Sequence, residues 1–170
     1  MNTKIEKEWI YIPDYFCEHR EVLGTVGKNP LIVIGVNPST AEPNNLDPTL
    51  KSVERIARSN GFDSFIMFNL YPQRATKPDN MDLVLNTKYH KKNLQEFENI
   101  LSKINNPSIW IAWGDLINKR KYLKKCRDDL INIAINYGSK FYMAGILTKN
   151  KNPRHPLYLK RDIKLQEFNM

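Results

Sequence analysis

The amino-acid sequence predicts an α/β fold, a three-layer sandwich around a central, mostly parallel four-stranded sheet. Two observations predict this class. Four short runs are continuously apolar, at residues 31–36, 65–70, 108–112 and 141–144, as in strands that are buried on both faces of a sheet. Stretches with helical spacing of apolar residues separate these runs. Such alternation implies right-handed crossovers, with ligands bound at the carboxyl ends of the strands.

The first helix is predicted to begin directly after Asp47. Asp47 is a favourable N-cap residue, Pro48 suits the first helical position, and Gly61 is a typical stop signal. Between these signals one face of the helix is apolar, with Leu50, Val53, Ile56 and Ala57. The same spacing predicts two further helices, over about residues 81–104 and 115–136.

A single domain is expected over residues 1–170, because a chain of 170 residues is long enough for one core. Residues 31–160 carry the alternating pattern and form the expected core of this domain. Residues 1–30 include Trp9 and Tyr11 and are expected to form a cap or an edge hairpin.

The composition limits the compartment and the chemistry. Apolar runs of about six residues are much shorter than the roughly 20 residues that span a bilayer, and the N-terminus lacks the apolar segment of a secretion signal. We therefore expect a cytoplasmic monomer without membrane contact. Cys17 and Cys126 lie far apart, and a structural zinc site needs about four ligands. No metal and no cofactor are expected.

The positive charge of the chain is concentrated in two segments. The formal net charge is +8, residues 119–127 hold six basic residues in nine, and residues 149–164 hold six against one acid, Asp162. Such clusters fit a polyanionic partner, and double- or single-stranded DNA is the expected one. A solvated helix face explains the charge as well, and composition alone leaves both interpretations open.

Unusual polar residues follow each predicted strand. Asn37 lies in Gly-Val-Asn-Pro after the first strand, and Asn69 lies in Phe-Asn-Leu at the end of the second. Trp113-Gly114-Asp115 follows the third strand, and Arg-His-Pro-Leu-Tyr, which contains His155, follows the fourth. Each motif alone is a common structural turn. Because the carboxyl ends of parallel strands share one edge, we expect all four to meet there.

These four segments resemble the motifs of the uracil-DNA glycosylase-like superfamily. Gly-Val-Asn-Pro is similar to its water-activating turn, Phe-Asn-Leu to its base-reading strand, Trp-Gly to the motif after its third strand, and His-Pro-Leu to its DNA-inserting loop. The chain also resembles a bacterial and phage family of unassigned function with Asn-Pro-Ser-Thr-Ala, Asp-Pro-Thr and His-Pro-Leu-Tyr-Leu signatures. The resemblance covers about residues 31–160.

The resemblance implies a DNA glycosylase that flips a base into a pocket and hydrolyses its N-glycosidic bond. That reaction needs a positioned water on one face of the sugar and donors aimed at the departing base. Asn37 and His155 are the expected catalytic residues, and Asn69 is expected to read the base edge. The other expected base-binding residues are Gly35, Val36, Pro38 and Tyr71.

Further residues are expected to contact DNA. Leu157 or Tyr158 would insert into the vacated stack, and Arg154 would contact a phosphate. The remaining expected DNA contacts are Ser39, Thr40 and Lys151. Residues 38–61 contain no Phe, Tyr or Trp to stack on the base, so Tyr71 or an N-terminal aromatic residue would have to replace it.

Two interpretations of function stay open. The first is a monofunctional glycosylase in DNA repair or phage defence. The second is a non-catalytic nucleic-acid or nucleotide-binding module of the same fold, an alternative that the uncharged Asn37 keeps open. Structural roles also remain open for Asn37 as a turn residue, for Asn69 as a satisfied buried amide, and for Asp47 as a simple N-cap with its carboxylate near the pocket.

Overall fold

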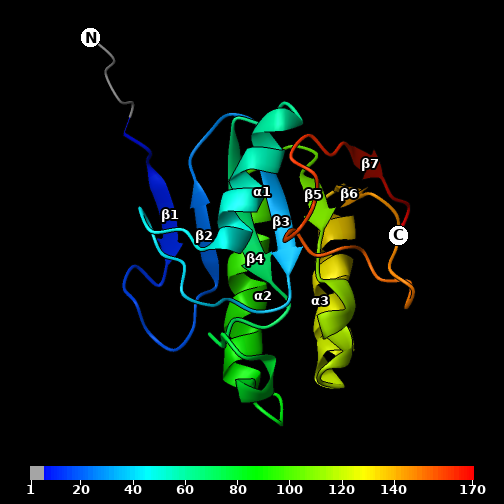
Figure 1. Cartoon of the computed structure of the whole chain (residues 1–170). Coiled ribbons are helices and arrows are strands. Elements are labelled where there is room, and N and C mark those ends of the chain that lie inside the picture. The colour runs from blue at the N-terminus through cyan, green and yellow to red at the C-terminus, as the bar shows by residue number, and fades with distance from the viewer. Residues whose placement is uncertain (1–5) are drawn as a thin grey trace.

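A computed structural model describes residues 6–170 and has an α/β architecture (Figure 1). In this range one mixed sheet contains seven strands in the order β1-β2-β4-β3-β5-β6-β7. The strands are β1 (Trp9–Ile12), β2 (Val22–Thr25), β3 (Pro30–Gly35), β4 (Ser64–Asn69), β5 (Ser108–Ile111), β6 (Lys140–Ala144) and β7 (Leu165–Glu167). The helices are α1 (Pro48–Ser59), α2 (Thr87–Leu101) and α3 (Tyr122–Asn136), with 3₁₀ turns η1 (Pro78–Asn80) and η2 (Gly114–Asn118).

The four apolar runs form the parallel middle of the sheet. β3 pairs in parallel with both β4 and β5, and β5 pairs in parallel with β6. The last pair between β3 and β4 joins Gly35 to Asn69, so these two strands end level with each other. The α/β class is confirmed. The expected four-stranded sheet is wrong in size, because antiparallel strands extend it at both edges.

The edge strands are short, which is why periodicity did not predict them. β1 and β2 have four residues each and β7 has three. β1 and β2 form an antiparallel hairpin at one edge, from Trp9 opposite Thr25 to Ile12 opposite Val22, in the segment expected to be a cap or an edge hairpin. Residues 1–5 of that segment lie outside the described residues. At the other edge β7 pairs antiparallel with β6.

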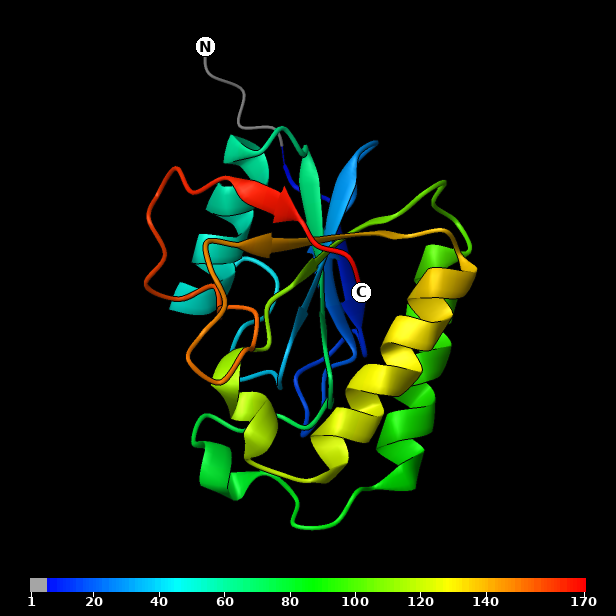
Figure 2. The ribbon, with the colours of Figure 1, turned by 90° about the vertical axis from the view of Figure 1, so that its right-hand side faces the viewer.

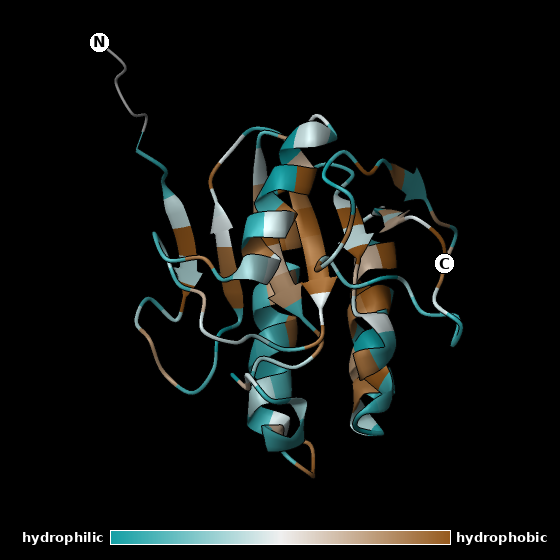
Figure 3. Cartoon of the chain, in the orientation of Figure 1, coloured by the Kyte–Doolittle hydropathy of each residue, from teal (hydrophilic) through white to brown (hydrophobic). Residues whose placement is uncertain are grey.

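The sheet is covered on both faces, which gives three layers. Figure 2 shows α1 on one face and α2 with α3 on the other. Leu31 and Val33 of β3 pack toward α1, whereas Ile32 and Ile34 pack toward α2 and α3. Figure 3 shows apolar central strands and helices with hydrophilic outer faces. None of the helices in residues 6–170 is long and apolar enough to cross a membrane.

The first helix begins where the sequence predicts, and the other two begin later. The Asp47 carboxylate accepts a hydrogen bond of 2.9 Å from the Leu50 N–H and caps α1. α2 begins only after Asn86, whose side chain caps it. The predicted third helix is divided into η2 and α3. The N-terminal end of α1 and the 3₁₀ turn η2 both lie beside the carboxyl ends of β3 and β4.

Candidate functional site

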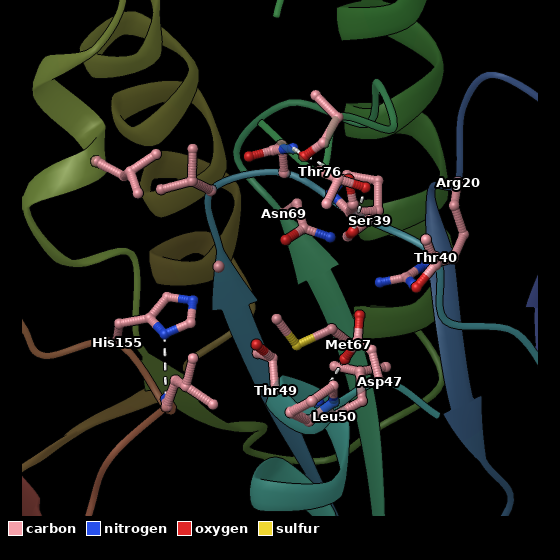
Figure 4. A pocket seen from close by; sticks show the side chains of 18 of the residues that line it. Arg20, Ser39, Thr40, Asp47, Thr49, Leu50, Met67, Asn69, Thr76 and His155 are labelled. Atoms are coloured by element: carbon pink, nitrogen blue, oxygen red, sulfur yellow. Dashed lines mark hydrogen bonds between the residues drawn. The ribbon is translucent and has the colours of Figure 1, made fainter. Parts of the chain in front are cut away.

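A pocket of about 350 Å³ opens at the carboxyl ends of β3 and β4 (Figure 4). Its volume lies in the range of small-molecule sites. Three of the four predicted motif segments contribute to its lining through Asn37, Asn69 and His155, and Leu116, which directly follows the remaining segment, lines it as well. The expected site residues that line it are Gly35, Val36, Asn37, Pro38, Ser39, Thr40, Asn69, His155 and Leu157.

Asn69 places an amide without a protein partner at the end of β4. Its side chain is only 2% exposed, and its Nδ2 has no hydrogen-bond partner within the described residues. Figure 4 shows this side chain directed into the pocket. A Cβ on Gly35 would lie 2.9 Å from Asn69 Oδ1 and 2.8 Å from Met67 Cε. A side chain at position 35 would therefore displace the ends of the Asn69 and Met67 side chains from their present positions.

His155 presents one ring nitrogen to the pocket from the opposite side (Figure 4). Its Nδ1 accepts a hydrogen bond of 3.1 Å from the Leu157 N–H, so the neutral ring carries its proton on Nε2. Burial lowers the pKa of His155 below its ordinary value of 6.5, and the Asp47 carboxylate opposes this shift. At neutral pH the side chain is therefore a neutral Nε2–H donor.

The segment that carries His155 is held by the Trp113-Gly114-Asp115 turn. The Gly114 N–H donates to the Pro153 carbonyl at 2.8 Å. Gly114 has a φ of +61°, and a Cβ there would lie 3.3 Å from His155 Cβ. Asp115 Oδ1 accepts from the Thr148 hydroxyl at 2.6 Å and from the Asn152 amide at 2.9 Å. These contacts fix the chain on both sides of Pro153.

Asn37 both shapes its loop and contributes to the pocket. Its Nδ2 donates to the Ala75 carbonyl at 2.8 Å and to the Pro38 carbonyl at 3.0 Å. These bonds leave Oδ1 as an acceptor to which no described residue donates. The structural role that the sequence left open is therefore real, and it orients the amide at the pocket wall.

Arg20 is the pocket residue that sequence reasoning missed most clearly. It precedes β2, is 2% exposed, and lines the pocket. Its Nη1 donates to the Ala41 carbonyl at 3.2 Å, and its Nε has no partner within residues 6–170. Burial, and next the neighbouring Arg74, lower the pKa of Arg20 to about 10. No sequence signal marks this residue, because its burial depends on the hairpin that packs beside β4.

Tyr71 does not line the pocket, which corrects its predicted base-binding role. β4 ends at Asn69 and the chain bends, so Tyr71 turns to the face covered by α2 and α3. There its hydroxyl donates to the Asp82 carboxylate and accepts from the Asn86 N–H at 3.1 Å. No Phe, Tyr or Trp of the described residues lines the pocket. Its walls are aliphatic instead, as with Leu50 and Met67.

The comparison with protein families gives one match, to a protein family of unknown function, DUF1643, over residues 20–157. The chain belongs to the DUF1643 family. The matched range covers most of the chain and includes Arg20, Asn37, Asn69 and His155. No curated protein and no solved structure shows significant similarity to this DUF1643 chain.

Three of the six expected DNA contacts of the DUF1643 chain, Lys151, Arg154 and Tyr158, lie outside the pocket. Tyr158 is 95% exposed and has a φ of +66°, an unusual conformation for a bulky residue. Lys151 is exposed, and Arg154 Nε donates to the Ile146 carbonyl at 2.8 Å. At the rim the Ser39 and Thr76 hydroxyls lie 2.9 Å apart. No group of three His, Cys, Asp or Glu side chains in the described residues is arranged to hold a metal.

The lowered pKa of His155 predicts a loss of stability in acid. Because the folded protein holds this pKa below 6.5, the unfolded chain binds the proton more readily. The contribution of His155 to the free energy of unfolding is therefore constant above about pH 7 and decreases as the pH falls through 6.5. NMR titration of the ring and urea unfolding at about pH 7.5 and about pH 5.5 measure both quantities. A His155→Gln variant should lose this part of the pH dependence; a His155 pKa at or above 6.5 would contradict the assignment.

Proposed function

We propose that the protein is a cytoplasmic DNA glycosylase that holds an extruded nucleobase in this pocket and hydrolyses its N-glycosidic bond. The observation that carries the proposal is one pocket lined by two donors, the buried Asn69 Nδ2 and His155 Nε2–H, neither of which donates to a described residue, and by aliphatic side chains such as Leu50 and Met67. Nucleobases are flat, apolar on their faces and rich in acceptors on their edges, so they match such a lining.

The reaction assigns a distinct role to each polar side chain. A water attacks C1′ of the sugar while the C1′–N bond breaks, and the bonding electrons leave with the base. His155 Nε2–H donates to the base carbonyl on which negative charge develops. Asn69 Nδ2 donates to the base edge, and Asn37 Oδ1 accepts a hydrogen bond from the attacking water. The proton released by the water goes to the departing base or to solvent.

Asn37 supports catalysis less strongly than a carboxylate would. It carries no charge, so it does not stabilise the positive sugar in the transition state. Its Nδ2 donors are also occupied by Pro38 and Ala75. Both facts predict a slow enzyme. They also favour the second candidate, a binding module that keeps the pocket without cleaving the bond.

The loop after His155 supports a DNA-inserting role. Leu157 lines the pocket while the next residue, Tyr158, projects into solvent. A left-handed backbone costs a non-glycine residue roughly 1 kcal/mol or more, and it is the conformation that turns this aromatic ring outward. An exposed ring beside a base-sized pocket is suited to filling the space that a flipped base vacates.

Release of a free base is the direct test of the proposal. DNA duplexes that carry uracil, mismatched thymine or modified pyrimidines are incubated with the protein, and mass spectrometry detects the released base.

The Asn69→Asp variant tests whether this residue reads the base. An ionised aspartate loses the donor and repels a carbonyl at position 4 of the base, but it accepts a hydrogen bond from an amino group there. Uracil-type substrates should therefore lose more rate than cytosine-type substrates. Binding without release by wild type would favour the non-catalytic module, and equal losses at an unchanged melting temperature would exclude Asn69 from the base edge.

DNA binding should depend on the second basic segment more than on the first. In residues 119–127, Lys119, Lys125 and Arg127 form ion pairs with neighbouring carboxylates, and Arg120 donates to four backbone carbonyls. In residues 149–164, the side chains of Lys149, Lys151, Lys160 and Arg161 are exposed and form no ion pair within the described residues. The second segment also contains His155 and Leu157, which line the pocket.

We therefore expect a triple variant, Lys149→Gln, Lys151→Gln and Lys160→Gln, to weaken DNA binding. The slope of log affinity against log salt should become shallower by about 1 for each phosphate that the variant no longer neutralises. Lys121→Gln, Lys124→Gln and Lys125→Gln together form the control with the same change in charge. Fluorescence anisotropy at several salt concentrations measures both variants. An equal decrease in affinity in the control, or an affinity that salt does not change, would contradict this placement.

A further inference from the structure

The pocket contains a buried positive charge that the proposed reaction does not use. Arg20 is 2% exposed, and burying an unpaired charge is costly unless an opposite charge or several hydrogen bonds offset it. A guanidinium has five N–H donors. Arg20 donates one hydrogen bond, from Nη1 to the Ala41 carbonyl. No carboxylate of the described residues lies within 4.0 Å of the Arg20 guanidinium.

The neighbouring arginine, Arg74, has a structural role, because protein groups accept most of its hydrogen bonds. Arg74 donates to the Ser39 carbonyl at 2.6 Å, to the Ala41 carbonyl at 3.1 Å and to the Tyr11 hydroxyl at 2.9 Å, and it stacks on Phe16. The Ala41 carbonyl thus has a second donor and does not require Arg20. Arg74 keeps only its Nε without a partner, whereas Arg20 makes a single hydrogen bond, so Arg20 has the larger capacity left for a ligand.

The surrounding charges leave the Arg20 end of the pocket positive. Arg74 lies close enough to lower the pKa of Arg20, while Asp47 raises it. The Asp47 carboxylate is held at the N-terminus of α1 by its bond to Leu50 N–H. Pro48, Thr49 and Leu50 of the first turn line the pocket, so the positive end of the α1 dipole also faces it. Figure 4 shows the Arg20 side chain reaching into the pocket beside Thr40 and Met67.

We propose that Arg20 forms an oxyanion subsite, and that the nucleobase-containing ligand of this pocket carries a carboxylate or phosphate group that pairs with it. The inference rests on the proposed function, because it assigns a substrate class to the same pocket. The anion has two candidate sources: an acidic substituent on the base itself, or a phosphate of the nucleotide. Either one supplies the two or more acceptor oxygens that match a guanidinium fork.

The test compares ligands that differ only in the anion. In the first arm, calorimetry compares uracil with its 5-carboxy and 6-carboxy derivatives, which contain no phosphate. In the second arm, it compares 2′-deoxyuridine with its 5′-monophosphate, and inorganic phosphate is measured alone. We expect the anionic ligand to bind wild type at least about tenfold more tightly than its neutral parent in one arm. The arm in which this occurs identifies the source of the anion.

Arg20→Met is the decisive variant, because methionine has a similar length and no charge. It should abolish the preference, so that the anionic ligand and its neutral parent bind this variant with equal affinity. Its melting temperature without ligand should be equal to or above that of wild type, because an uncompensated buried charge is removed. Arg74→Met is the matched control, and it should lower the melting temperature because it removes the hydrogen bonds and the aromatic stacking that Arg74 makes.

The outcomes separate this inference from the proposed function. Equal binding of neutral and anionic ligands in both arms would overturn the oxyanion subsite and leave the base pocket intact. A preference that survives in Arg20→Met, or a large decrease in the stability of that variant, would assign Arg20 a purely structural role. If no base or nucleoside binds, charged or neutral, the proposed function fails together with the inference. Arg20→Lys should retain only part of the preference, since an ammonium lacks the planar fork.

Discussion

The close approach of the chain to Gly114 is the constraint on which the site depends. A hydrogen bond of 2.8 Å joins Gly114 N–H to the Pro153 carbonyl, and a glycine with positive φ leaves room for His155. Through this contact the segment after the last parallel strand reaches the ends of β3 and β4. Without it the pocket would keep Asn37 and Asn69 but lose the wall that His155 and Leu157 form. The Asp115 bonds to Thr148 and Asn152 strengthen the same attachment.

The pocket combines polar groups whose burial opposes folding. Arg20 and Asn69 are each 2% exposed and have nitrogen atoms without partners in the described residues. Leaving a buried donor unpaired costs roughly 1–3 kcal/mol, so a fold optimised for stability alone would fill these positions with apolar side chains. Both residues line one cavity beside a histidine held as a neutral donor, and the ligand that we propose would accept all of these hydrogen bonds. An acceptor-rich base with an acidic group is such a ligand.

The sequence predicted the elements whose signals are local. Continuous apolar runs indicated β3 to β6, and Asp47 with Pro48 indicated the start of α1, because burial on both faces and capping leave direct marks in composition. The hairpin of β1 and β2 lies in the segment that was expected to form a cap or an edge hairpin, and the three-residue strand β7 was missed. Asn37, Asn69 and His155 were found from their place after strands. Tyr71 was misplaced because the bend after β4 reverses its direction, and Arg20 was missed because its burial arises from strand pairing far along the chain.

The central claim is that Asn69 and His155 donate to one bound base while Arg20 pairs with the anionic group of the same ligand, and side-chain NMR tests it most directly. Isotope-labelled protein is titrated with a duplex that carries a single 5-carboxyuracil on a sugar whose 2′-fluorine slows cleavage, and with the same duplex carrying an abasic site. We predict that the side-chain N–H resonances of Asn69 and His155 shift with the base and stay unchanged with the abasic duplex. The Arg20 resonances should shift with the base alone if the base carries the anion, and with both duplexes if a phosphate does. Identical Asn69 and His155 shifts with both duplexes, or shifts confined to the exposed lysines of residues 149–164, would contradict the claim.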